Sequence, residues 1–367
     1  MSLALENVTK LADGETHLDD INLTFRQGSF YVLLGPTLAG KTSLLRLLAG
    51  LDRPTRGRIV LDGRDLTTTP VWKRQVSMVY QQFINYPNLT IRDNIAFPLR
   101  RAGLDAAEIE RRVRATTEML KIDTLLDRTP GELSGGQQQR AALARSLVKE
   151  SDLLLLDEPL INLDYKLREQ LRDEFANIFS GNRRSIVIYA TTEPLEALML
   201  GGEVVVLNEG RQLQHGPTHE VYRNPRTEEV ARVFNDPPMN MIDGRIDADH
   251  VLLGQDLRLP LVDHLAALAR GAYRFGIRAS DLGLIRSNIE EVEFPVLVEL
   301  AEISGSETFI HARHNEVTWV IQERGVHGHD LGQAISAYID PHYLYAFRED
   351  GRLAAAPGPA RGGAPAR

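Results

Sequence analysis

The chain has 367 residues, of which 25% are charged and 43% hydrophobic, as in an ordinary globular protein of two domains or more. A net charge of −8 argues against a broad electrostatic grip on nucleic acid, and the absence of cysteine excludes disulfides, thiol nucleophiles and cysteine-bound metals. Residues 1–6 lack the features of a signal peptide, and no apolar stretch approaches the roughly 20 residues that cross a bilayer. We therefore expect any membrane association to go through a partner.

The first strong signal is a glycine-rich loop between an apolar segment of strand length, residues 30–34, and a leucine-rich helix start. It matches the phosphate-binding pattern G-x-x-x-x-G-K-[ST]. The loop and helix start consist of Gly35, Pro36, Thr37, Leu38, Ala39, Gly40, Lys41, Thr42 and Ser43. Backbone N–H groups there would bind phosphate oxygens, Lys41 would add a positive charge and Thr42 a hydroxyl for Mg²⁺. The alternative is a glycine turn before an ordinary helix.

Strands and helices alternate after this loop. Strands are predicted at residues 57–61 and 76–80, an amphipathic helix over 109–120, and a polar helix over 138–149. The apolar run that begins at residue 152 and ends at 156 is typical of a buried parallel strand, and the β-branched residues of 184–190 predict another strand. This order predicts a parallel α/β sheet covered on both faces.

Two carboxylates, Asp157 and Glu158, close the buried strand at 152–156. Asp157 could hold Mg²⁺ beside the phosphate loop, and Glu158 could accept a proton from an attacking water. Gln81, at the exit of an earlier strand, offers an amide to Mg²⁺ or to that water. The alternatives are a pair of acidic residues capping a strand and a solvated glutamine.

A second anion site is predicted at a helix start that combines a hydroxyl, bare backbone N–H groups and a helix dipole. It consists of Ser134, Gly135, Gly136 and Gln137. One nucleotide in one subunit does not need two such sites. Two subunits could instead enclose a nucleotide between the phosphate loop of one and the Ser-Gly-Gly turn of the other.

The composition changes near residues 235–238, and short β-rich segments follow, as in a small barrel or sandwich. We expect one domain over 1–235, with a helical part at about 88–150, and a second over 236–352. The Ala-, Pro-, Gly- and Arg-rich tail, residues 353–367, is expected to be disordered.

The order of these motifs resembles the ATP-binding cassette of ABC transporters. The resemblance makes residues 35–42 Walker A, Gln81 the glutamine loop, 133–137 the signature, 153–157 with Glu158 Walker B, and 162–164 the D-loop. It implies a RecA-like core with an antiparallel β subdomain and a helical subdomain. The β-rich half resembles the OB-type regulatory domain of carbohydrate importers, as in maltose-importer ATPases.

In finer detail the chain resembles the less regular of the two unlike ATPase subunits of proteobacterial glycerol importers. The segments that carry this are 34–38, 80–87 and 189–194. The resemblance implies ATP and Mg²⁺ as ligands, two permease subunits, a second and unlike ATP-binding subunit, and a periplasmic solute-binding protein. It places the chain on the cytoplasmic face of the bacterial inner membrane, without nucleic acid as a partner.

On this interpretation the chain energises uptake of glycerol or a related polyol or sugar. Three alternatives stay open: an sn-glycerol-3-phosphate or oligosaccharide importer ATPase, a largely non-hydrolysing regulatory partner of a second ATPase, and a soluble cassette protein acting on ribosomes or DNA. The single cassette, the absence of heptads and the acidic balance argue against the last.

Two positions depart from the family pattern. Ala12 stands near the position of an aromatic residue that stacks on adenine, and Thr192 stands where the family carries a switch histidine. A threonine hydroxyl donates one hydrogen bond but carries no positive charge. We therefore expect this chain's own site to hydrolyse ATP poorly; the alternative is that Thr192 merely caps a helix.

Overall fold

The computed structural model describes residues 1–82, 84–161, 168, 169, 171, 172, 174, 175 and 185–358. The chain divides into two compact units, Met1–His219 and Glu220–Arg367. Phe83, the expected D-loop at 162–164 and residues 359–367 of the expected tail lie outside the described residues.

A six-stranded sheet forms the centre of the first unit, with strand order β10-β9-β3-β8-β7-β6. Neighbouring strands are parallel except that β10 is antiparallel to β9. The strands are β3 (Phe30–Leu34), β6 (Val76–Val79), β7 (Leu153–Asp157), β8 (Ile186–Thr191), β9 (Glu203–Asn208) and β10 (Arg211–Pro217). Strands β7 and β8 are buried throughout, as expected for central strands covered on both faces. The predicted parallel α/β sheet is confirmed.

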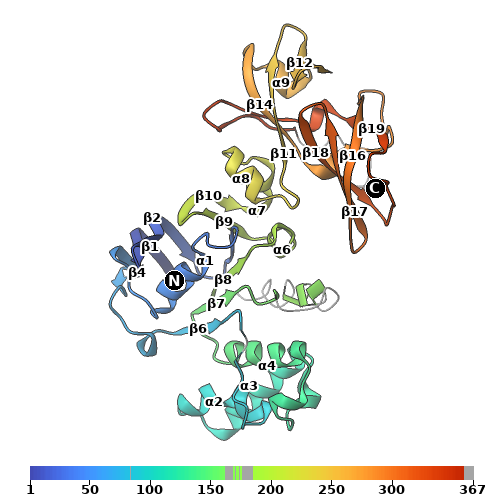
Figure 1. Cartoon of the computed structure of the whole chain (residues 1–367). Helices are drawn as coiled ribbons and strands as arrows, with labels where there is room; N and C mark the ends of the chain where they lie inside the picture. The colour runs from blue at the N-terminus through green and yellow to red at the C-terminus, as the bar shows by residue number, and fades with distance from the viewer. Residues whose placement is uncertain (83, 162–167, 170, 173, 176–184, 359–367) are drawn as a thin grey trace. The chain divides into compact units, whose positions relative to one another are not determined.

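Helices cover both faces of this sheet. They are α1 (Lys41–Ala49), α2 (Ile91–Arg101), α3 (Ala106–Met119), α4 (Gly135–Leu147) and α6 (Pro194–Leu200), with 3₁₀ turns η1 (Val71–Lys73), η2 (Asp123–Leu125) and η3 (Pro130–Glu132). Helix α7 (Thr218–Arg223) spans the point where the chain passes from the first unit to the second. Because alternate strand residues point to opposite faces, Leu155 packs with α1 whereas Leu156 packs with α2, α3 and α4. Helix α1 and the group α2–α4 therefore lie on opposite faces of the sheet (Figure 1).

A smaller antiparallel sheet, in the order β2-β1-β4-β5, shares the core cluster of α1. Its strands are β1 (Ser2–Ala12), β2 (Glu15–Arg26), β4 (Arg56–Leu61) and β5 (Arg64–Asp65). An Asp-Gly turn joins β4 to β5, with φ of 48° at Asp62 and 79° at Gly63. Positive φ at both residues is what a two-residue hairpin of this type requires.

Two antiparallel sheets make up most of the second unit, in the orders β13-β12-β11-β14-β20-β21 and β15-β19-β16-β17-β18, around one hydrophobic core. The strands are β11 (Asn240–Ile246), β12 (His250–Leu253), β13 (Leu257–Pro260), β14 (Gly271–Ile277), β15 (Leu282–Gly283), β16 (Val292–Ser304), β17 (Glu307–His314), β18 (Val317–Arg324), β19 (Ala334–Ile339), β20 (Tyr345–Phe347) and β21 (Leu353–Ala355). The helical pieces are α8 (Glu228–Val233), α9 (Asp263–Ala266), η4 (Ala279–Asp281) and η5 (Pro341–Tyr343). The predicted β-rich second half is confirmed.

The second unit begins before the expected boundary at residue 235. Helix α8 belongs to it, because Ala231 packs with Met239 and Phe347, and Glu228 N donates to Gly351 O at 2.9 Å. The expected disordered tail also begins too early. Residues 353–355 form β21, whose alanines pack against the core and which pairs with β20.

Among the described residues, no helix combines the length and the apolar composition that a bilayer crossing requires.

Candidate active site

The phosphate loop joins β3 to α1, and its two glycines are needed for space. A Cβ atom at Gly35 would lie 2.3 Å from the carbonyl oxygen of Leu207, and one at Gly40 would lie 2.7 Å from that of His17. Gly40 also has a φ of 97°, which side-chain-bearing residues rarely adopt. No side chain caps the start of α1 within the described residues, so its first backbone N–H groups remain available to an anion.

Leu38, at the tip of the loop, is an irregular feature. Its φ is 68° and its side chain is 93% exposed. A left-handed conformation costs a non-glycine residue on the order of 1 kcal/mol. The loop thus presents an apolar side chain where its own backbone favours glycine.

The ammonium group of Lys41 is buried inside the loop. Its Nζ donates to the carbonyl oxygens of Gly35 and Pro36 at 2.8 and 2.9 Å, and lies 3.2 Å from Oε1 of Glu158. Burial lowers the pKa of Lys41, and the nearby Glu158 carboxylate opposes this shift. The cation is therefore held where the phosphate loop meets the end of β7.

Asp157 and Glu158 follow each other at the end of β7 but make different contacts. The buried Asp157 accepts a hydrogen bond at Oδ1 from Thr42 Oγ1, at 3.0 Å. Burial raises the pKa of Asp157, and the bond from Thr42 opposes that effect. Glu158 has a φ of 44°, and its N–H donates to Ala190 O at 3.0 Å. This left-handed turn lets adjacent carboxylates face Thr42 and Lys41 separately.

The chemistry of these side chains suits Mg²⁺. Thr42 and Asp157 are oxygen donors in contact with each other, and Mg²⁺ is commonly held by one or two carboxylates together with substrate phosphates. The described residues contain no cluster of three His, Asp or Glu side chains that would hold a metal by themselves. Such a cluster is not needed for a metal that phosphate oxygens help to bind.

Gln81 and Thr192 lie in the turns that follow neighbouring strands of the sheet. Gln81 is exposed after β6, whose end is in register with that of β7 through Val79 and Leu156. Thr192 is half-buried between β8 and α6, and it lines a small cavity together with Glu158. The helix-cap alternative for Thr192 does not match the structure, because Glu193 is the N-cap residue of α6.

Ser134 to Gln137 begin helix α4 and form a reciprocal cap. Ser134 Oγ accepts from Gln137 N at 3.4 Å, and Gln137 Oε1 accepts from Ser134 N at 3.0 Å. Next to them, a Cβ atom at Gly135 would contact nothing within 4 Å. The helix start is therefore open, and it belongs to a helix on the opposite face of the sheet from α1.

Ala12 ends β1, opposite Glu15, at a turn formed by Asp13 and Gly14. Its neighbour Leu11 is 45% exposed. No aromatic side chain stands in this stretch, as the sequence already indicated.

Three residues near the site were missed by the sequence analysis. His17 Nδ1 lies 3.2 Å from Ser43 Oγ at the start of α1. Thr191 and Glu196 join β8 to α6 through a buried hydrogen bond of 2.6 Å. A signal was present, because Tyr189 and Thr191 put two hydroxyls on one face of a strand predicted to be buried.

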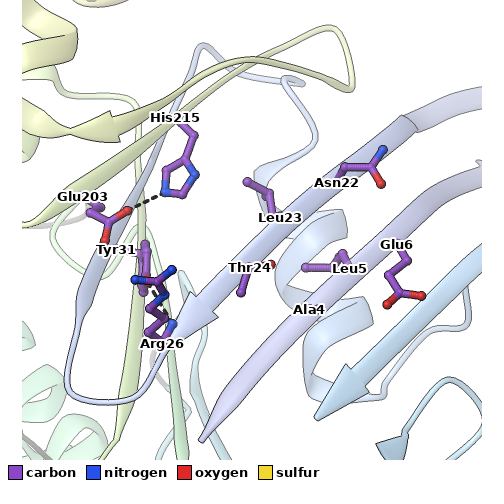
Figure 2. Close-up of a pocket in the computed structure, with 10 residues that line it drawn as sticks. All are labelled: Ala4, Leu5, Glu6, Asn22, Leu23, Thr24, Arg26, Tyr31, Glu203 and His215. Carbon is purple, nitrogen blue, oxygen red and sulfur yellow. Dashed lines mark hydrogen bonds and ion pairs between the residues drawn. The ribbon is translucent and has the colours of Figure 1, made fainter. Parts of the chain in front are cut away.

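A separate hollow of about 560 Å³ lies in the first unit, beside the smaller sheet (Figure 2). In Figure 2, His215 and Glu203 line one side of the hollow, and Asn22 and Thr24 of β2 line another. His215 Nε2 lies 2.7 Å from Glu203 Oε2. None of its lining residues is a predicted site residue. It is distinct from the arrangement around Lys41.

Comparison with known proteins agrees with this geometry. A family model described as ABC transporter matches residues 18–161. The chain is 36% identical over 348 residues to the sn-glycerol-3-phosphate import ATP-binding protein UgpC of Salmonella typhimurium, covering 94% of this chain and 97% of that protein. It is 36% identical over 362 residues to the maltose/maltodextrin import ATP-binding protein MalK of Photorhabdus laumondii, covering 95% and 96%.

A third relative, the trehalose/maltose import ATP-binding protein MalK of Thermococcus litoralis, is 37% identical over 364 residues, covering 94% of this chain and 96% of that protein. Among solved structures, the chain is similar to a dimeric post-hydrolysis state of the ATP-binding cassette MJ0796 bound to ADP and Pi. The TM-score is 0.52 at 27% identity, over 59% of this chain and 98% of that one.

Proposed function

The chain belongs to the ABC transporter family as an ATP-hydrolysing import subunit, and we propose that it energises uptake of glycerol or a related polyol or sugar through a membrane permease. The observation that carries the proposal is the meeting of Lys41, Thr42, Asp157 and Glu158 at one edge of the sheet. A phosphate loop beside two carboxylates is suited to phosphoryl transfer from a nucleotide to water.

We assign the roles within the site from these contacts. The backbone N–H groups of the loop and Lys41 bind the phosphates of ATP, and Thr42, Asp157 and Gln81 supply oxygen ligands to Mg²⁺. The metal, when bound, neutralises phosphate charge. Glu158 is the base toward water, and the contact of its Oε1 with Lys41 Nζ at 3.2 Å orients this carboxylate.

The working unit proposed is a pair of unlike ATP-binding subunits. Helices α1 and α4 cover opposite faces of the sheet, which suits a nucleotide shared between the phosphate loop of one chain and the Ser134 turn of another. Ala12 and Thr192 weaken the site built on this chain's own loop, whereas its Ser134 turn is complete. The chain therefore contributes more to its partner's site than to its own.

The permease is proposed to dock in a hollow of about 460 Å³ between the sheet and the helical group. Three partly or fully exposed aromatic side chains line it: Trp72, Tyr86 and Phe97. The rings of Tyr86 and Phe97 lie 4.9 Å apart, and the guanidinium of Arg145 lies 5.0 Å from the ring of Tyr86. Aromatic residues and arginine are the types enriched at protein interfaces. On this proposal the chain lies at the cytoplasmic face of the inner membrane, in a complex with two permease subunits and a periplasmic solute-binding protein.

The second candidate solutes are sn-glycerol 3-phosphate and maltodextrins, which the names of the similar proteins favour. Co-purification with candidate permease subunits, followed by reconstitution in proteoliposomes, separates these solutes. We expect ATP-dependent uptake of labelled glycerol in the presence of the cognate solute-binding protein. ATP-dependent uptake of only glycerol 3-phosphate or maltodextrin would replace glycerol by that solute, and uptake independent of ATP would contradict the proposed function.

A further inference from the structure

We propose that Thr191 and Glu196 are positioning residues for ATP hydrolysis, which together fix the turn carrying Thr192 beside Glu158. This inference rests on the proposed hydrolysis at this chain's own phosphate loop. It concerns a buried carboxylate in α6 that the assigned roles leave without a function.

The Glu196 carboxylate is 3% exposed and accepts two hydrogen bonds at the same oxygen. Thr191 Oγ1 donates to Oε2 at 2.6 Å, and Tyr189 OH donates to it at 2.9 Å. A carboxylate is costly to bury unless such donors satisfy it. The first turn of α6 is thereby attached to the end of β8.

Thr191 also makes two contacts that Tyr189 does not. Its Oγ1 accepts from the N–H of Glu193 at 3.0 Å, and its carbonyl oxygen accepts from the N–H of Gly35 at 3.4 Å. One residue thus links the phosphate loop, the turn and α6. Thr192 lies between the two anchored neighbours Thr191 and Glu193.

Glu196 and Thr192 border the same small space as Glu158. A cavity of about 10 Å³ is lined by these three residues and five neighbours, and a volume near this size admits about one water molecule. The backbone of Glu158 is tied to the same strand end, since its N–H donates to Ala190 O at 3.0 Å. Releasing the Thr191–Glu196 bond would therefore shift Thr192 relative to Glu158.

A purely stabilising role for the same hydrogen bonds makes a different prediction, and a matched pair of variants separates the two. Thr191→Val and Tyr189→Phe each delete one hydroxyl that donates to the same carboxylate oxygen. We expect Thr191→Val to lower kcat of the full-length chain about tenfold with an unchanged KM for ATP, because small misplacements of catalytic groups reduce rate steeply. Tyr189→Phe is expected to keep a kcat within about twofold of that of the unaltered chain, although its melting temperature should fall about as much as that of Thr191→Val.

Two further comparisons test whether the effect acts through Thr192. In a Thr192→Ala background, Thr191→Val should cause no further loss of kcat. Glu196→Gln, which keeps an acceptor oxygen, should retain more activity than Glu196→Leu. Equal losses for Thr191→Val and Tyr189→Phe, or additive losses in the double variant, would overturn the positioning role.

A binding measurement keeps this test independent of turnover. Thr192 stands where the family carries a switch histidine, and on this inference its hydroxyl contacts the γ-phosphate of ATP. Thr191→Val should therefore reduce the ratio of ATP to ADP affinity, measured with labelled nucleotides, whereas Tyr189→Phe should not. An unchanged ratio in Thr191→Val would overturn the inference. If the unaltered chain does not hydrolyse ATP but the variants still show this pattern of affinities, the result counts against the proposed function alone.

Discussion

Lys41 shows how a single residue depends on its surroundings. Its ammonium group is 4% exposed and is satisfied by two loop carbonyls and by Glu158. A buried cation that is desolvated in this way interacts strongly with a phosphate, because the local dielectric constant is low. The loop carbonyls direct this residue inward, and the Glu158 carboxylate opposes the lowering of its pKa by burial.

We expect Lys41→Ala to weaken binding of Mg-ATP by about 10- to 100-fold, as the loss of a hydrogen bond from a charged group predicts. Binding of a labelled ATP analogue to the purified chain measures this. Lys149→Ala is the matched control, since Lys149 is another lysine whose pKa is lowered by burial, and it donates to Val76 O instead. Equal affinities for the unaltered and Lys41→Ala chains would contradict the assignment of Lys41.

Asp281 in the second unit predicts a dependence of stability on pH. Burial, partly opposed by Arg278, raises its pKa from 3.8 to about 6. Between these values the folded chain retains a proton that the unfolded chain has lost, so stability decreases as the pH rises through this window. Asp281→Asn should flatten that part of the profile.

The buried Trp319 reports unfolding of the second unit, once Trp72 in the first unit is replaced by Phe. Thermal unfolding followed by fluorescence from pH 4 to 7 then gives the profile. Asp243→Asn, at an exposed carboxylate of the same unit, is the control. An unchanged slope in Asp281→Asn would show that another group titrates.

At the scale of elements, sequence patterns were most informative where burial was simple. Strands β7 and β8 were predicted because burial on both faces requires apolar residues. The glycine loop before α1 was predicted because its geometry leaves no room for side chains at Gly35 and Gly40. Strands β9 and β11 were missed. The first is a short apolar segment that pairs in parallel with the distant strand β3, and in the second Asp243, Gly244 and Arg245 interrupt the apolar pattern.

The site itself was predicted in part. The phosphate loop and the carboxylates after β7 form sequence motifs whose spacing reflects their chemistry, whereas Glu196 belongs to no such motif. Its proposed role depends on its burial in the first turn of α6 and on the hydrogen bond from Thr191, which lies on β8. A glutamate in the first turn of a helix resembles a surface residue until the tertiary structure is known.

The hollow beside α2 and β6 gives a prediction about the permease. The chain contains no cysteine, so Tyr86→Cys carries a single site for a cross-linker. We expect this variant to capture a permease subunit in membranes, because Tyr86 lines the hollow and is 40% exposed. Ile289→Cys, 91% exposed in the second unit, is the control for unspecific capture. Capture from both positions alike, or from neither, would contradict the docking surface.

At the scale of the whole molecule, the two anion sites of the first unit serve different nucleotides in the proposed pair of unlike subunits. On this proposal the phosphate loop holds this chain's own ATP, and the open start of α4 completes the site of the second subunit. Losing one transition-state donor costs about 100- to 1000-fold in rate. A site with Thr192 in place of a charged donor should therefore be the slow one.

The most direct test compares Ser134→Arg with Glu158→Gln in this chain, each assembled with the second ATP-binding subunit and the permease. Steady-state ATP hydrolysis of the complex is the measurement. The account predicts that Ser134→Arg abolishes turnover, because it blocks the fast site on the partner, and that Glu158→Gln leaves much of it. Equal damage by the two substitutions, or full-rate hydrolysis by this chain alone as a homodimer, would contradict it.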